Sequence, residues 1–200
     1  MVYLRTGTDE RVYYTVFSYR IMLPYGKSLS MSSYFVLLNY NKKMLVNTGV
    51  IESQGDLEAL LNTAGLDYFD LDYIVNMSSR PEHIGLNSLI QYSNKKALFL
   101  APPGDIAYIE DTVRAHEERY VPGFYRMVSG NTEGVEALCR GRVFDLGGEK
   151  VSVSIDGDER TGKYFLDLQD SCIKLYPDGV CLKRQEKHQV LLTKEAVNDC

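Results

Sequence analysis

The chain has 200 residues, which suits one domain with a buried core and is too short for two comfortable ones. Apolar residues make up 44% and charged residues 24%, a globular composition that excludes a disordered or low-complexity protein. The formal net charge is -5 without any basic stripe, which argues against a nucleic-acid partner. No apolar run approaches the roughly 18 residues of a membrane span, so no membrane partner is expected.

The beginning of the sequence and its cysteines predict a cytoplasmic protein. Residues 1–5 are not followed by the long apolar run of a signal peptide. The four cysteines are widely separated and form no CxxC motif: Cys139, Cys172, Cys181 and Cys200. This spacing argues against a zinc ribbon and is typical of reduced thiols, although a Cys172–Cys181 bridge across a hairpin stays open.

The first part of the chain predicts β-structure. Tyrosine, which favours strands, occurs 15 times in the sequence. Residues 11–17 are rich in Tyr and Val, and residues 33–39 contain the apolar run of a buried strand. A polar turn at residues 41–43 should fold a third strand, residues 44–46, back on the second as a hairpin.

The next segment predicts an amphipathic helix. Ser53 stands three residues before Asp56, as the partners of a capping box do. Gly65 has the position of a glycine just past a helix C-terminus. The apolar residues between them recur at helical spacing: Leu57, Leu60, Leu61 and Ala64.

Two further helices are predicted among short buried strands. Strands are expected at residues 73–75 and 97–100, and Pro81 should open a helix between them that runs to about Tyr92. Asp105 can cap a third helix. The residues that share one face of this third helix are Ile109, Val113 and His116. Such alternation of strands and helices favours layered α/β packing.

The chain after about residue 120 predicts a mainly antiparallel sheet. Asp156-Gly157 and Pro177-Asp178-Gly179 are hairpin-turn sequences. The strands predicted around them cover residues 143–146, 151–155, 164–168, 172–176 and 189–193. No repeat or linker interrupts the sequence, so residues 1–200 are expected to form a single domain.

The order of these landmarks resembles the metallo-β-lactamase-like family. Residues 47–49, Asn-Thr-Gly after a strand, resemble the family's Asp-Thr-Gly turn, and residues 78–85 line up with its HxHxDHxG signature. Residues 97–105 resemble the strand and loop that follow, and residues 143–148 the family's DLGG hairpin. The resemblance covers roughly residues 30–180. It implies an α/β (α+β) fold, an αββα four-layer sandwich shortened at the C-terminus.

Most positions that resemble the family's metal ligands hold other residues. Ser78 and Arg80 stand where the two leading histidines belong, and only the closing histidine, His83, is retained. The six ancestral metal-loop positions are Ser78, Arg80, Glu82, His83, Glu159 and Asp178. A dinuclear site of this family draws on about five histidines, whereas the chain has three in total. The sequence therefore predicts that the dinuclear site is lost.

A flavodiiron-type subgroup of the family is distantly similar. It uses HxExDH in the same loop, and residues 80–83, Arg-Pro-Glu-His, match that outline. Ser78 still replaces the first ligand, Arg80 replaces the glutamate, and no flavodoxin segment follows. Diiron chemistry is therefore not expected.

Arg80 and His83 support different hypotheses about this loop. The Arg80 guanidinium, which cannot ligate a metal, could pair with Glu82, and with Glu159 or Asp178, where a metal ion once bound; the alternative is that it points to solvent. Arg80 could also bind an anion beside the helix after Pro81.

The resulting expectation is a degenerate, non-catalytic binding or structural module that forms a homo-oligomer or binds another protein. On this hypothesis the chain has no catalytic residue, no metal and no cofactor. The alternative is a metal-dependent hydrolase with an atypical mononuclear zinc or iron site made of Glu82, His83 and Asp178.

Overall fold

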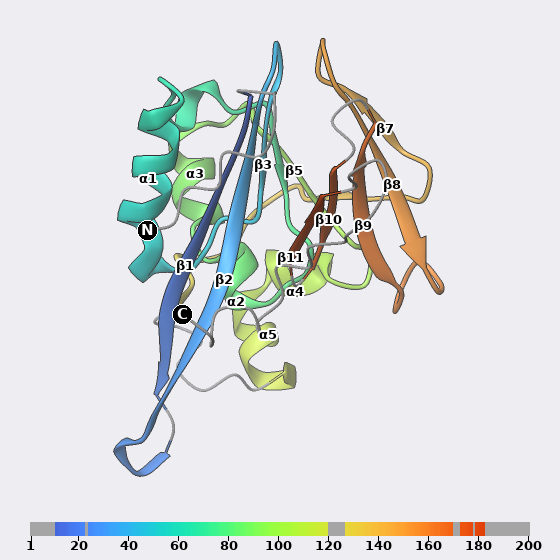
Figure 1. Cartoon of the computed structure of the whole chain (residues 1–200). Helices are drawn as coiled ribbons and strands as arrows, with labels where there is room; N and C mark the ends of the chain where they lie inside the picture. Colours follow the sequence, from blue (N-terminus) through green and yellow to red (C-terminus); the bar gives the residue numbers. More distant parts are fainter. Residues whose placement is uncertain (1–10, 23, 120–126, 170–172, 178, 183–200) are drawn as a thin grey trace.

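The computed structural model describes residues 11–22, 24–119, 127–169, 173–177 and 179–182. They form two packed β-sheets, with helices covering the outer face of the first sheet (Figure 1). The first sheet has the order β1-β2-β3-β4-β5-β6, and the second has the order β11-β10-β9-β8-β7.

The elements have the following bounds. The strands of the first sheet are β1 (Val12–Met22), β2 (Ser28–Asn39), β3 (Lys43–Val46), β4 (Tyr73–Val75), β5 (Leu98–Ala101) and β6 (Glu136–Ala137). Those of the second sheet are β7 (Val143–Asp145), β8 (Lys150–Asp156), β9 (Lys163–Leu168), β10 (Ile173–Tyr176) and β11 (Gly179–Leu182). The helices are α1 (Gln54–Thr63), α2 (Pro81–Ile84), α3 (Asn87–Ser93), α4 (Ile106–Glu110) and α5 (Thr112–Arg119). Short 3-10 turns are η1 (Pro24–Gly26), η2 (Ile51–Ser53) and η3 (Tyr68–Asp70).

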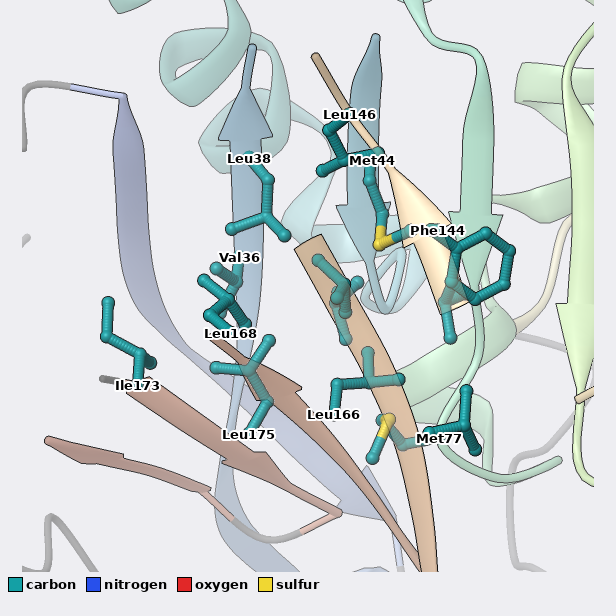
Figure 2. Close-up of a cluster of buried hydrophobic side chains, with 14 of the residues drawn as sticks. Val36, Leu38, Met44, Met77, Phe144, Leu146, Leu166, Leu168, Ile173 and Leu175 are labelled. Atoms are coloured by element: carbon teal, nitrogen blue, oxygen red, sulfur yellow. The ribbon is translucent and has the colours of Figure 1, made fainter. Parts of the chain in front are cut away.

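Strand β2 shows why the two sheets and the helices pack as layers. Its residues Tyr34 to Leu38 are all buried. Val36 and Leu38 face the second sheet, where they meet β9 and β10 side chains (Figure 2), whereas Phe35 and Leu37 face the helices. Because successive side chains of a strand point to opposite faces, a continuous apolar run is what a strand between two layers requires.

The second sheet has one buried face. In β8, Val151, Val153 and Ile155 are buried and alternate with more exposed residues, as the sequence predicted. These side chains belong to the core between the sheets. The described residues therefore form two packed sheets with helices on the outer face of the first, as expected of three layers of the predicted four-layer sandwich.

The expected capping box at the start of α1 is wrong. The Ser53 hydroxyl turns back to residue 50, where it donates to the Val50 carbonyl oxygen at 2.7 Å and accepts from the Val50 N–H at 3.0 Å. It makes no capping hydrogen bond to α1. The helix itself is present, and its apolar residues Leu57, Leu60 and Leu61 are buried as predicted.

The helix expected from Pro81 to Tyr92 is two short helices, α2 and α3. The helix is interrupted at Gly85 because the backbone of this residue contacts two other backbone segments. Its N–H donates to the Gly49 carbonyl oxygen, and its own carbonyl accepts from the Ser129 N–H, both at 2.7 Å. A Cβ atom at Gly85 would lie 2.4 Å from the Gly49 and Met127 carbonyl oxygens.

The helix expected after Asp105 is also divided, into α4 and α5. The Asp111 side chain accepts from the Arg114 N–H at 3.0 Å and so begins α5. The break turns the second helix, so that Thr112 and Ala115 are buried while Val113 is half exposed. The predicted apolar face with Val113 was therefore wrong.

The first hairpin is longer than the sequence suggested. Strands β1 and β2 pair along all of β1, from Val12 with Leu38 to Met22 with Ser28. Strand β3 pairs only with residues 36–39 of β2, so the remainder of the hairpin projects beyond it (Figure 1).

Some of the predictions concern residues that the structure does not describe. Cys172, Asp178, His188 and the strand expected at residues 189–193 lie outside them, and so does the suggested disulfide. Cys139 is a free, exposed thiol. Over the ranges that the structure covers, no helix combines the length and apolar character needed to cross a membrane.

Candidate functional site

The candidate site lies where parallel strands β3 and β4 end. Val46 pairs with Val75 at these carboxyl ends, the edge of an open α/β sheet where binding loops gather. The Asn47 N–H donates to the Val75 carbonyl oxygen at 2.9 Å, and the Asn76 N–H donates to the Leu100 carbonyl oxygen at 2.8 Å. The loops after β3 and β4 therefore start side by side.

Asn47 replaces the turn aspartate and has a left-handed backbone with φ of 60°. Asparagine adopts this conformation more readily than most side chains. Its side-chain oxygen accepts from the Met77 N–H at 3.0 Å, which ties the two loops together. Its Nδ2 is buried and has no hydrogen-bond partner among the residues that the structure describes.

A buried amide network holds the backbone of His83. The His83 carbonyl oxygen accepts from the Thr48 N–H at 2.9 Å and from the Asn76 side chain at 2.7 Å. Asn87 accepts from the Thr48 hydroxyl at 2.9 Å and donates to the Asn76 side chain at 2.8 Å. All four residues are at most 2% exposed. The network fixes α2 and α3 against the strand ends.

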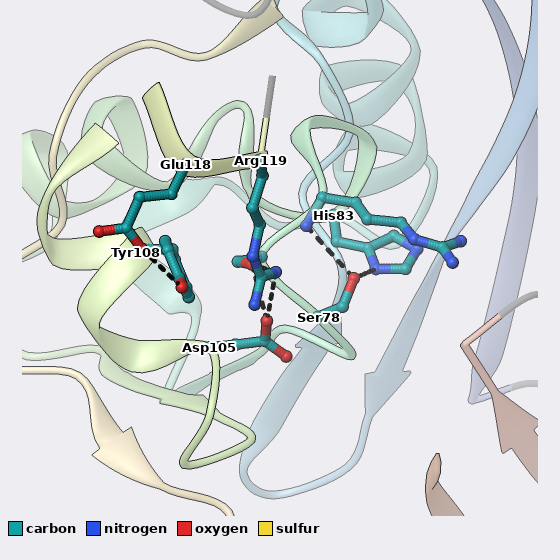
Figure 3. A network of polar contacts seen from close by, with 8 residues as sticks. Ser78, His83, Asp105, Tyr108, Glu118 and Arg119 are labelled. Carbon is teal, nitrogen blue, oxygen red and sulfur yellow. Dashed lines mark hydrogen bonds and ion pairs between the residues drawn. The ribbon is translucent and has the colours of Figure 1, made fainter. Parts of the chain in front are cut away.

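The Ser78 hydroxyl oxygen lies 2.7 Å from Nδ1 of His83 (Figure 3). The same oxygen accepts from the Arg80 N–H at 3.2 Å. A hydroxyl has one donor and two acceptor sites, so the direction of this bond is set by the His83 tautomer. Two of the predicted loop residues are thus bonded to each other.

Glu82 and Arg80 both lie near Tyr19 of β1. Burial, followed by the Glu82 charge and a hydrogen bond to Glu82, raises the pKa of Tyr19 well above its ordinary value, while the Arg80 charge opposes the shift. Glu82 therefore contacts the first hairpin. Arg80 is exposed, and its pairing with Glu82 stays a prediction, as does its role in binding an anion.

Behind Ser78, a second group of polar residues joins the loop to α4 and α5. The Ser79 hydroxyl donates to the Asp105 carboxylate at 2.7 Å. Arg119 donates to the Ser79 hydroxyl and to Asp105, the latter at 2.8 Å, and its guanidinium lies 3.9 Å from the Tyr108 ring centroid (Figure 3). Asp105 was expected to cap a helix, but its side chain makes no capping bond.

Of the two remaining predicted positions, Glu159 and Asp178, only Glu159 is among the described residues. Glu159 lies in the exposed turn between β8 and β9, where it accepts from the Arg140 N–H at 3.4 Å. This turn meets the loop after β5, because a Cβ at Gly104 would lie 2.4 Å from the Arg160 carbonyl oxygen. Asp178 is outside the described residues.

The candidate metal ligands are described only in part, because Asp178 lies outside the described residues. No group of three or more His, Cys, Asp or Glu side chains within the described ranges could hold an ion. Nδ1 of His83 is bonded to Ser78, and Glu82 contacts Tyr19.

Sequence reasoning missed the residues that hold the loop in place. Asn76, Asn87 and Arg119 were not singled out, and Tyr19 was assigned to no strand. Asn47 and Asn76 each follow directly on a parallel strand. Polar residues at two neighbouring strand ends were the signal that could have revealed this network.

The comparisons with known proteins identify the fold. No protein-family model matches the chain, and no curated protein matches it in sequence. The metallo-β-lactamase SMB-1 bound to 2-mercaptoethanesulfonate is similar in structure, with a TM-score of 0.57 and 18% identity over 78% of this chain and 55% of that one. A metallo-β-lactamase family protein from Thermus thermophilus has the same TM-score and identity over 86% and 61% of the two chains.

A β-lactamase from Chitinophaga pinensis gives a further match, with a TM-score of 0.57 and 18% identity over 82% of this chain and 57% of that one. The chain therefore has a metallo-β-lactamase-like fold. It spans less than two thirds of the length of each of these three structures.

Proposed function

We propose that this metallo-β-lactamase-like domain has exchanged its metal site for a hydrogen-bonded loop and acts as a non-catalytic binding or structural module. The contact between Ser78 and His83, 2.7 Å long, is the observation that carries the proposal. It occupies a ring nitrogen of the one histidine that matches the family's signature.

The chemistry of the neighbouring side chains supports this proposal. A metal site needs deprotonated or neutral ligands that converge on one point. The guanidinium of Arg80 offers only hydrogen-bond donors and cannot ligate a metal. Arg119 donates to Asp105 (Figure 3), and the Ser79 hydroxyl donates to the same carboxylate. Polar groups that satisfy each other in this way stabilise a loop but leave no ligand set.

The alternative is a hydrolase with a mononuclear zinc or iron site at Glu82, His83 and Asp178. The two proposals differ in metal content, which can be measured on protein purified without chelators. We expect less than one tenth of an equivalent of any transition metal by plasma mass spectrometry, because a hydroxyl and a guanidinium stand at two ligand positions.

The variant His83→Ala and the matched variant His116→Ala make this test specific. His116 lies on α5, outside the loop. Stoichiometric zinc or iron that is lost in His83→Ala and kept in His116→Ala would contradict the proposal and favour the hydrolase.

A further inference from the structure

The outer edge of β1 has no neighbour among the strands that the structure describes. β1 ends the six-stranded sheet, and its 11 residues offer a long row of backbone N–H and C=O groups. Native edge strands are usually protected by lysine, proline or a bulge. β1 contains no Lys, Pro or Gly, and its one charged residue is Arg20.

The projecting part of the hairpin likewise has no third strand beside it among the described residues. Beyond β3 it is a ribbon of two strands (Figure 1), packed near β3 through the buried Phe17 and Tyr19 and more exposed toward its turn. Tyr25 at its turn is 100% exposed and Leu29 of β2 is 48% exposed. An additional strand along β1 would turn this ribbon into a three-stranded sheet.

The two faces of β1 restrict what can pair with it. Phe17 and Tyr19 belong to the core under the helices, whereas Val12 and Tyr14 belong to the core between the sheets. A partner strand must keep this alternation, because a shift of one residue would reverse its faces.

A second copy of β1 satisfies this requirement. If two copies run antiparallel and overlap along all 11 residues, Val12 of one copy lies opposite Met22 of the other, and Phe17 lies opposite Phe17. Every odd residue then faces an odd residue, so both faces continue across the pair. Arg20 lies opposite Tyr14, a favourable pair of cation and ring, and no like charges meet.

We propose that β1 pairs with β1 of a second copy of this chain about a two-fold axis at Phe17, which joins the two six-stranded sheets. The interface is isologous, since the same strand contributes to both sides. This inference goes beyond the proposed function, because it depends on the sheet edge and not on the loop that carries His83.

Lysine at Ser18 tests the pairing. Ser18 is exposed and would lie opposite Val16, so the two copies of Ser18 would be diagonal neighbours roughly 7–8 Å apart. Two lysines there repel each other and block the edge. By light scattering and analytical ultracentrifugation the unaltered chain is expected to be a dimer, and Ser18→Lys should weaken the dimer roughly tenfold or more.

Ser28→Lys is the matched control. Ser28 is an exposed serine on β2, separated from the proposed interface by β1. The same change of charge there should leave the dimer intact, and circular dichroism would confirm that both variants fold. Hydrogen exchange should show that the outward-facing amides of β1 become more exposed in Ser18→Lys.

Three results would overturn the pairing: a monomer at high concentration, a dimer that Ser18→Lys does not weaken, or a monomer in which the β1 amides are protected. The last result would mean that another segment of the same chain covers the edge. Metal content measured on the same sample separates this inference from the proposed function, because a dimer with stoichiometric metal would contradict only the latter.

Discussion

At the scale of single residues, the loop that carries His83 is held by buried polar side chains that are hydrogen-bonded to one another. Asn87 bonds to both Thr48 and Asn76, and these in turn hold the His83 carbonyl. Buried polar atoms cost more when a partner is removed than the bond itself contributes. The network should therefore be sensitive to loss of one amide.

Asn87→Ala tests this sensitivity. It removes one partner of the Thr48 hydroxyl and of the Asn76 Nδ2, both of which keep a contact with the His83 carbonyl, and it removes the donor to the Asn76 Oδ1. We expect the free energy of unfolding to fall by roughly 2–4 kcal/mol in urea denaturation. Asn62→Ala, at an exposed position of α1, should change it by less than about 0.5 kcal/mol. Equal effects of the two substitutions would rule out the network as a main support of the loop.

Tyr14 gives a prediction about alkaline pH. Burial raises the pKa of Tyr14 to about 12. The neutral phenol is thus favoured in the folded state. The contribution of the Tyr14 phenol to the free energy of unfolding is therefore complete below the unfolded pKa of about 10, and it is lost as pH rises toward 12.

Tyr14→Phe should reduce the loss of stability between pH 10 and 12 by roughly 1–2 kcal/mol, as measured by urea unfolding at each pH. Tyr92→Phe, which changes a tyrosine that is 81% exposed, is the control and should leave the loss unchanged. If Tyr14→Phe lost stability as steeply as the unaltered chain, the burial of this phenol could not be the cause.

At the scale of elements, close backbone contacts decide where helices end. Gly85 separates α2 from α3 because its own backbone bonds to Gly49 and Ser129. A side chain has no space there, since its Cβ would lie 2.4 Å from two carbonyl oxygens. This contact, and not helix propensity, determines that the helix stops.

Gly85→Ala should accordingly destabilise the fold by about 1–3 kcal/mol or more through steric overlap. Gly55→Ala is the matched control, because Gly55 lies within α1 and a Cβ there has no neighbour within 4 Å. It should stabilise the protein by about 0.5–1 kcal/mol through helix propensity. Thermal unfolding of both variants compares the signs directly, and a stabilising Gly85→Ala would show that the crowding is not real.

The elements that could be predicted are those whose pattern depends on burial alone. The apolar run of β2 and the alternation in β8 indicated the correct strands because their faces meet one or two cores. The projecting half of the first hairpin could not be recognised, since serines occupy one of its faces. The break before α5 depends on Asp111, whose capping role is indistinguishable in sequence from an ordinary helix surface position.

The site could be predicted in part. The sequence predicted that the site follows two strands, and it showed that Ser78 and Arg80 differ from the histidines of the family's signature. The bond between Ser78 and His83 was not, because two residues five positions apart meet only when α2 begins at Pro81. Arg119 reaches Ser79 across forty positions, a contact that no local pattern could indicate.

At the scale of the whole molecule, the fold and the candidate site have separate determinants. Two hydrophobic cores, one between the sheets and one beneath the helices, hold the sandwich together. Both cores consist of apolar side chains, and none of their residues is one of the six candidate loop positions. On the proposed function, the loop can therefore exchange its ligands while the packing of the sheets and helices is kept.

We propose that hydrogen bonds such as that between Ser78 and His83 occupy the place of the family's metal site. Crystals grown with excess zinc, and measured for anomalous scattering at the zinc absorption edge, test it most directly. We predict no zinc peak within coordination distance of His83 and an intact contact between the Ser78 hydroxyl and Nδ1. A zinc ion bound to His83, with Ser78 displaced from the ring, would contradict it.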